Sequence, residues 1–133
     1  MHKLSPTVEE IRKLQDEAPE GRIVMINLLK FRADGGREAY RRYLEAANVA
    51  RREGVQPPRL LYAGIVGDDF GDGEDWDFLM LAEYDDYNHY AETMLNPLYR
   101  DAVVPIRSEA LEKTLFMVSH PADRSAIWDE PAR

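Results

Sequence analysis

The chain has 133 residues, a length typical of one domain with a single hydrophobic core. Its 25 acidic and 17 basic side chains give a net charge of −8, which disfavours binding to nucleic acid or to an anionic membrane surface. The absence of cysteine excludes disulfides, thiolate metal sites and a cysteine nucleophile. No apolar run reaches the length of a membrane span, and the first residues lack the apolar core of a signal peptide, so we expect a cytoplasmic protein.

The first predicted element is a short amphipathic helix over residues 5–17. Ser5 is expected to be its N-cap and Pro6 its first residue, and apolar residues recur at three-residue spacing from Val8. The sequence Ala-Pro-Glu-Gly at 18–21 then ends the helix and turns the chain.

A strand is predicted over residues 22–32, where the nine residues between two arginines include seven apolar ones. Both faces of this strand are apolar and must be covered, which is typical of a central strand. Asn27 and Lys30 interrupt the apolar run. Because successive side chains of a strand point to opposite faces, these two lie on opposite sides of the sheet.

Glycines and prolines divide the rest of the chain into alternating elements. The pattern predicts, in order, a helix over 37–54, strands over 59–67 and 76–84, a helical region from 85 that Pro105 interrupts, and a strand over 113–119. Residues 120–133 lose this periodicity, and we interpret them as an extended tail whose Ile127 and Trp128 need an apolar surface. We therefore expect one domain over 1–119 and a C-terminal tail over 120–133.

The predicted order after the first helix is β-α-β-β-α-β, the order of a ferredoxin-like α+β fold. Such a fold has a four-stranded antiparallel sheet with helices on one face, here with an extra N-terminal helix. The other face would expose the apolar side chains of the two central strands over an area too large for a monomer. We therefore predict a homodimer in which a second copy packs against this face.

Several strings in the chain resemble the family known as domain of unknown function 1330. These are VMINLLKFR at 24–32, Ala39 with Tyr40 and Tyr43, Ala63-Gly64, Trp76-Asp77, Asn96-Pro97 with Tyr99, and Arg107. The resemblance implies the dimeric α+β barrel superfamily, whose members include cofactor-independent monooxygenases, muconolactone isomerase, polyketide cyclases and haem-handling enzymes. The family itself has no settled activity. Ile106 stands where relatives carry a histidine, so the resemblance gives no imidazole role there.

Asn27 lies among apolar neighbours, where an unpaired amide would cost about 1–3 kcal/mol. It must therefore be hydrogen-bonded, either to the protein in a structural role or to a carbonyl or oxyanion of a ligand. Lys30 and Arg32 share the opposite face of the strand. They form either a pair that reaches solvent at the strand end or, together with Arg107, a site for a carboxylate or enolate.

Tyrosines and one aspartate complete the candidate residues. Tyr43 is either a core aromatic or a phenol that orients a substrate, and Asp77 is either exposed at the start of a strand or, if buried, a general base. The candidate catalytic residues are Asn27, Tyr43 and Asp77, and the candidate ligand-binding residues are Lys30, Arg32, Tyr62, Trp76, Tyr99 and Arg107.

We expect neither a metal nor a cofactor. The three histidines do not have the spacing of metal ligands, and glycines at positions 71 and 73 stand where an EF-hand would need ligating side chains. The asparagine, tryptophan and histidine pattern of haem-degrading relatives is met only at Asn27.

Three functions remain open from the sequence. The first is a cofactor-independent enzyme, or enzyme-like protein, that acts on a small, largely apolar carbonyl compound by isomerisation, cyclisation or oxygenation. The second is a non-catalytic dimer that binds a small hydrophobic metabolite. The third is a structural or stress-related dimer with a filled cavity.

Overall fold

The computed structural model describes residues 3–17, 20–71, 73 and 75–128 of the chain. The elements are, in order, α1 (Val8–Glu17), β1 (Ile23–Phe31), α2 (Gly36–Arg52), β2 (Arg59–Ile65), β3 (Phe78–Tyr84), α3 (Tyr87–Leu95), the π-helix η1 (Tyr99–Val103), α4 (Val104–Ala110), β4 (Leu111–Ser119) and the 3-10 helix η2 (Arg124–Ile127). The predicted β-α-β-β-α-β order is confirmed.

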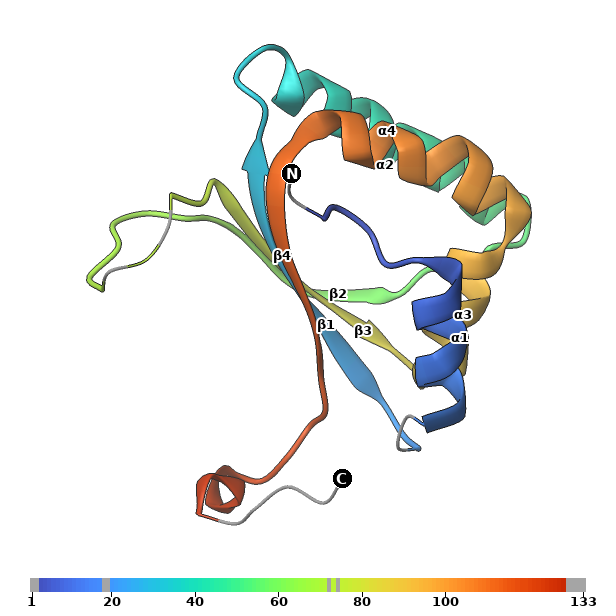
Figure 1. Ribbon diagram of the computed structural model, residues 1–133, viewed down its shortest axis with the longest axis vertical. Coiled ribbons are helices and arrows are strands. Elements are labelled where there is room, and N and C mark those ends of the chain that lie inside the picture. The colour runs from blue at the N-terminus through green and yellow to red at the C-terminus, as the bar shows by residue number, and fades with distance from the viewer. Residues whose placement is uncertain (1–2, 18–19, 72, 74, 129–133) are drawn as a thin grey trace.

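The four strands form one antiparallel sheet in the order β2-β3-β1-β4. β1 and β3 lie in its centre, as the sequence predicts, and helices cover one face of the sheet (Figure 1). This is the ferredoxin-like arrangement, and α1 is the additional helix at its N-terminal end.

The two faces of β1 differ in burial. Residues from Ile23 to Phe31 alternate between buried side chains, which face the helices, and side chains that are only half-buried. The sequence predicts burial on both faces, but a single chain buries only the face that its helices cover. Ile26 and Leu28 lie on the uncovered face, which we call the outer face of the sheet.

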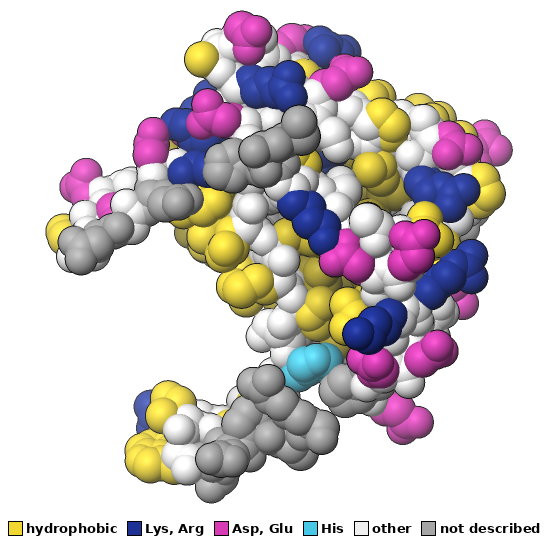
Figure 2. Space-filling model, in the orientation of Figure 1, with side chains coloured by type: hydrophobic (Ala, Val, Ile, Leu, Met, Phe, Trp, Pro, Cys, Tyr) yellow, Lys and Arg dark blue, Asp and Glu magenta, His cyan; other side chains and the backbone are white. Residues whose placement is uncertain are grey.

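The outer face is apolar across the three strands β3, β1 and β4. Ile26 is flanked by Leu81 and Met117, and Leu28 is flanked by Leu79 and Leu115. Met117 is 45% exposed and Leu115 37% exposed. In Figure 2, hydrophobic side chains gather on the side of the sheet that faces away from the helices.

Two segments project from the sheet on this outer side. They are the connection between β2 and β3 and the tail that follows β4 (Figure 1). The tail is not wholly extended, because η2 forms within it, capped by the Asp123 side chain. Ile127 and Trp128 are 81% and 76% exposed, so the apolar surface that the sequence predicts for them is not provided by the described part of the same chain. Residues 129–133 of the predicted tail lie outside the described residues.

The start of α1 differs from the prediction. The helix begins at Val8, and its cap is Thr7 rather than Ser5. The Thr7 hydroxyl accepts a hydrogen bond from the Glu10 amide at 3.1 Å, while the Glu10 carboxylate accepts one from the Thr7 amide at 2.9 Å. This reciprocal pair is a capping box, which satisfies two backbone donors at the start of the helix.

The sequence predicts that Pro105 interrupts the helical region, and this prediction is wrong. It lies in the first turn of α4, a position that favours proline, and η1 runs directly into this helix. The strand boundaries also differ from the predicted ones: β2 ends at Ile65, β3 begins at Phe78, and β4 begins at Leu111.

No helix among the described residues is long and apolar enough to cross a membrane.

Candidate functional site

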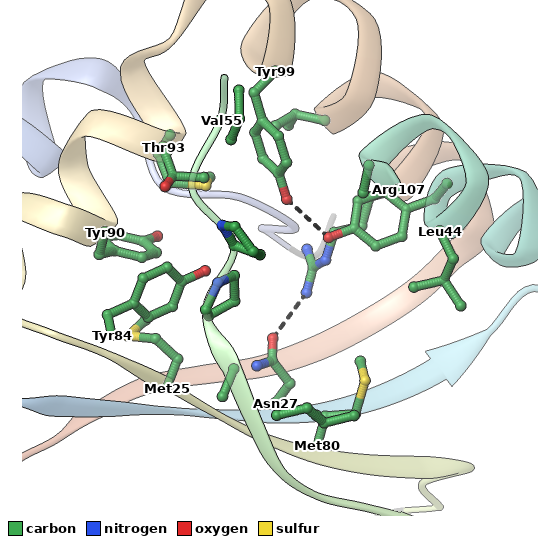
Figure 3. A pocket seen from close by; sticks show the side chains of 18 of the residues that line it. Met25, Asn27, Leu44, Val55, Met80, Tyr84, Tyr90, Thr93, Tyr99 and Arg107 are labelled. Atoms are coloured by element: carbon green, nitrogen blue, oxygen red, sulfur yellow. Dashed lines mark hydrogen bonds between the residues drawn. The ribbon is translucent and has the colours of Figure 1, made fainter. Parts of the chain in front are cut away.

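A cavity of about 300 Å³ lies between the inner face of the sheet and the helices. Every layer contributes to its wall. All four strands contribute from the sheet, and α2, α3, η1 and α4 contribute from the helices. The segment at 55–58 and the N-terminal segment at Ser5 and Pro6 complete the wall. Figure 3 shows the side chains converging on this space. The volume is at the small end of the range for ligand pockets, roughly 300–1000 Å³.

Asn27 and Arg107 form a buried polar pair in the wall. Asn27 points from β1 toward the helices, and its Oδ1 accepts a hydrogen bond from Arg107 Nη2 at 3.3 Å (Figure 3). Both residues are only 9% exposed. Arg107 reaches this position because α4 leads directly into β4, which pairs with β1.

Arg107 also connects the N-terminal segment to the sheet. Its Nη1 donates to the carbonyl oxygen of Leu4 at 2.7 Å, and its Nη2 lies 3.5 Å from Thr114 Oγ1. The guanidinium carbon is 5.4 Å from the centre of the Phe116 ring, which also lines the cavity. A single buried arginine therefore holds α4, β1, β4 and the segment before α1 together.

Tyr43 and Tyr99 supply a pair of hydroxyl groups opposite Asn27. Their oxygens are 3.0 Å apart, so one hydroxyl donates to the other (Figure 3). Burial raises the pKa of Tyr99 well above its ordinary value, and the neighbouring Tyr43 hydroxyl raises it further. Tyr99 is therefore protonated at neutral pH, and the hydroxyl pair can donate one hydrogen bond to a ligand.

Tyr84 and Tyr90 stand at the other side of the same cavity (Figure 3). Burial raises the pKa of both phenols above the ordinary range, so both are neutral at physiological pH. The Tyr90 hydroxyl is buried and has no hydrogen-bond partner among the described residues. A buried unpaired hydroxyl costs free energy, and a ligand oxygen would relieve that cost.

The structure brings four of the nine predicted site residues together in this cavity. They are Asn27, Tyr43, Tyr99 and Arg107. The other five lie elsewhere. Successive side chains of β1 point to opposite faces of the sheet, so Lys30 points away from the face that carries Asn27. The remaining residues lie at strand ends or on the outer face.

Lys30 and Asp77 meet at the end of β1, outside the cavity. Lys30 Nζ is 2.7 Å from an oxygen of Asp75 and 3.5 Å from one of Asp77. Asp77 also accepts a hydrogen bond from the Phe31 amide at 2.9 Å and lies 3.8 Å from Arg37. Through these contacts the Asp77 carboxylate connects the segment before β3 to the end of β1.

Arg32, Tyr62 and Trp76 have separate positions. Arg32 Nε donates to the carbonyl oxygen of Leu111 at 3.2 Å, which ties the end of β1 to β4. Tyr62 is an exposed residue of β2, paired with Leu81 on the outer face. The Trp76 ring has the Lys113 ammonium 4.6 Å from its centre, a cation-π contact near the surface.

Sequence reasoning missed Arg51, Tyr84 and Tyr90 as lining residues. A signal for Arg51 is present, because residues 40, 44, 47 and 51 recur at helical spacing along one face of α2. Tyr84 is opposite Ile23 in the register of the sheet, which assigns it to the inner face. No such pattern identifies Tyr90, because its place in the cavity depends on how α3 packs against the sheet.

The described part of the chain contains no cluster of side chains suited to binding a metal ion. No group of three histidine, cysteine, aspartate or glutamate residues lies close enough there to hold a metal ion. His89 is engaged locally instead: its ring nitrogens are 3.1 Å from the Asp85 amide nitrogen and 3.1 Å from the Gln56 carbonyl oxygen.

Comparison with known proteins gives structural neighbours. No family model matches the chain, so its resemblance to the family of unknown function 1330 stays a prediction. No curated protein matches it either. A solved structure of a protein of unknown function from Rhodopseudomonas palustris is 26% identical, with a TM-score of 0.75, and the match covers 92% of this chain and 99% of that chain.

Two less similar structures share the fold. A dabb family protein with a ferredoxin-like fold from Mesorhizobium loti is 18% identical, with a TM-score of 0.51 and coverage of 77% of this chain and 99% of that one. A dimeric protein of unknown function with a ferredoxin-like fold from Bacteroides fragilis is 18% identical, with a TM-score of 0.53 and coverage of 74% and 95%. The chain thus has the ferredoxin-like fold of proteins whose function is not known.

Proposed function

We propose that this protein binds a small, largely apolar carbonyl compound in the cavity between its sheet and its helices. The observation that carries the proposal is the buried pair of Asn27 and Arg107 in the wall of an otherwise mostly apolar and aromatic cavity. Ligand sites combine an apolar lining with a few convergent polar groups in this way, because the lining supplies affinity and the polar groups fix orientation.

The lining supports a binding role more directly than a catalytic one. A general base works best with a pKa near the working pH, and the described lining residues include no histidine, aspartate, glutamate, lysine or cysteine. Burial raises the pKa of Tyr84, Tyr90 and Tyr99, which keeps these three phenols neutral. Removal of a proton from a ligand by a side chain of this cavity is therefore unfavourable at neutral pH.

An enzyme of the isomerase, cyclase or monooxygenase type is the second candidate. It is favoured by the Tyr43 and Tyr99 pair, because their hydroxyls and the Asn27 and Arg107 pair together offer donors to an oxygen that gains negative charge. In such a reaction the protein stabilises an enolate or oxyanion rather than acting as a strong base. Product analysis with any compound that binds distinguishes this candidate from a pure binder.

The functional unit that we propose is a homodimer. The apolar outer face around Ile26 and Leu28 is left uncovered in one chain, and the Bacteroides fragilis neighbour is described as dimeric. A second copy packed sheet to sheet would cover this face, and the projecting Ile127 and Trp128 would then be placed beside the partner. Burial of exposed apolar area at about 25 cal/mol per Å² gives a strong drive for this assembly.

Filling the cavity tests the proposed function. Ala47 lines the cavity on α2, whereas Val49 is exposed on the same helix. Benzamide and acetophenone are suitable neutral carbonyl probes, with binding measured by calorimetric titration. We expect Ala47→Leu to abolish binding and Val49→Leu to leave it unchanged. Equal binding by both variants, or no binding of any small carbonyl compound to the wild-type chain, contradicts the proposal.

A further inference from the structure

The cavity has the opposite charge from the protein around it. The chain has a net charge of −8, and Figure 2 shows acidic side chains spread over the surface. Among the described residues that line the cavity, however, the charged ones are Arg51 and Arg107, and none is acidic. A ligand inside therefore meets a positive potential, which acts more strongly in these low-dielectric surroundings than it would in water.

Arg107 lacks an anionic partner within the described residues. Its hydrogen bonds go to neutral oxygens, those of Leu4 at 2.7 Å, Asn27 at 3.3 Å and Thr114 at 3.5 Å, and the phenol that it also approaches, that of Tyr40, is neutral too. None of the ion pairs found among the described residues includes it. A buried charge is costly unless it is paired, so this guanidinium favours the arrival of an anion.

The geometry leaves the guanidinium able to bind one more oxygen. Two of its hydrogen bonds, to Asn27 and Thr114, are longer than the usual range and share one nitrogen. Only the bond to Leu4 is short. Bonds from arginine to an anionic oxygen are shorter and roughly twice as strong as neutral ones, so a carboxylate here can compete with the long contacts.

We infer that the cavity selects a monoanion: a small molecule with an aromatic or otherwise apolar body and one carboxylate or enolate group, held by Arg107. The inference rests on the proposed function and deepens it by naming the charge of the ligand. The Phe116 ring and the tyrosines of the wall surround the body of the molecule. Arg51, an exposed residue of the lining, adds a second positive charge that attracts an anion from solution.

Matched ligand pairs test this inference on the unaltered protein. Benzoate is compared with benzamide, and phenylacetate with phenylacetamide, because each pair differs in charge but hardly in shape. We expect each carboxylate to bind roughly ten- to hundredfold more tightly than its amide in a calorimetric titration. Amides that bind as tightly as the carboxylates overturn the inference and leave the proposed function standing. Absence of binding by both members of each pair overturns both.

Arginine variants test whether the Arg107 guanidinium causes the preference for carboxylates over amides. Arg107→Met removes the charge while keeping most of the volume, and Arg52→Met is the control, since Arg52 adjoins Arg51 but does not line the cavity. We expect Arg107→Met to bind carboxylate and amide equally and Arg52→Met to keep the wild-type preference. If Arg107→Met does not fold, Arg107→Gln, which retains a donor for the Leu4 carbonyl, takes its place. A preference for carboxylates that persists in the neutral variant overturns the assignment to Arg107.

Discussion

Arg107 Nη2 lies 3.3 Å from the Oδ1 atom of Asn27, and this contact joins α4 to the central strand β1 across 80 residues of sequence. It places a buried cation of the cavity wall beside a neutral amide instead of a carboxylate. Two substitutions at Asn27 separate its structural role from its role toward a ligand.

Asn27→Leu keeps the volume but removes the acceptor for Arg107. We expect the free energy of unfolding to fall by about 1–3 kcal/mol, because a buried charged donor loses a partner. Asn27→Asp, in contrast, supplies a carboxylate, so we expect stability at neutral pH to be retained. The same aspartate would occupy the guanidinium and repel anions, and so should abolish the binding of benzoate. Urea unfolding and calorimetric titration measure the two effects. An Asn27→Asp protein that binds benzoate as well as the wild type contradicts this account of the site.

Gly36 fixes the approach of α2 to the end of β1. A Cβ atom at this position would lie 2.6 Å from the carbonyl oxygen of Ala110 and 3.0 Å from Phe31. We expect Gly36→Ala to destabilise the protein by about 1–3 kcal/mol, because the close neighbours are largely backbone atoms that cannot rotate away. Gly67→Ala is the matched control, since nothing lies within 4 Å of a Cβ atom there. Equal denaturation midpoints for the two variants would contradict this expectation.

Alkaline pH should destabilise the fold through the buried tyrosines. Burial raises the pKa of Tyr40, Tyr84, Tyr90 and Tyr99 above the ordinary value of about 10. Above about pH 10 the unfolded chain loses phenolic protons that the folded chain retains, so the free energy of unfolding declines as the pH rises. Below that pH both states keep these protons, and the tyrosines contribute no pH dependence.

Tyr90→Phe checks the origin of this decline. The variant removes one titrating group, so its free energy of unfolding should fall less steeply with pH than that of the wild type. At neutral pH it should be as stable as the wild type or more stable by about 1 kcal/mol, because the deleted hydroxyl has no partner in the described part of the chain. Urea unfolding at a series of pH values measures both effects. An unchanged slope would show that Tyr90 does not take part.

The outer face of the sheet predicts the assembly state. Leu28 lies at its centre, between Leu79 and Leu115, so Leu28→Glu should separate a homodimer into monomers by burying a charge in the interface. Val49→Glu, at an exposed position of α2, should leave the dimer intact. Sedimentation at micromolar concentration distinguishes the two. A wild-type chain that sediments as a monomer contradicts the dimer, but not the cavity, which one chain forms on its own.

The architecture could be predicted from the sequence because it depends on local periodicity. The strand period of β1 places Asn27 and Lys30 on opposite faces, and the structure confirms this: Asn27 faces the cavity, and Lys30 binds Asp75 at the strand end. The order of elements then determines which strands are central. Local chemistry was harder to predict, as with Thr7, whose capping box with Glu10 competes with a cap at Ser5.

The site could be predicted only in part, because it depends on contacts between distant segments. Asn27 stands out as a polar residue in an apolar strand. Nothing in the sequence around Arg107 shows that its side chain would reach Asn27, or that the chain near Leu4 would provide it with a carbonyl oxygen. The grouping of Lys30 and Arg32 with Arg107 failed for the same reason: their side chains leave the strand on the other face.

The most direct test of the central claim is a titration of nitrogen-labelled protein with benzoate, followed by NMR. If the ligand binds in the cavity, the side-chain amide signals of Asn27 and the Nε–H signal of Arg107 shift together, and both saturate at the affinity found by calorimetry. The side-chain signal of Gln15, which bonds to Asn88 and does not line the cavity, should not move. Shifts that leave Asn27 and Arg107 unchanged would place the ligand elsewhere and contradict the account.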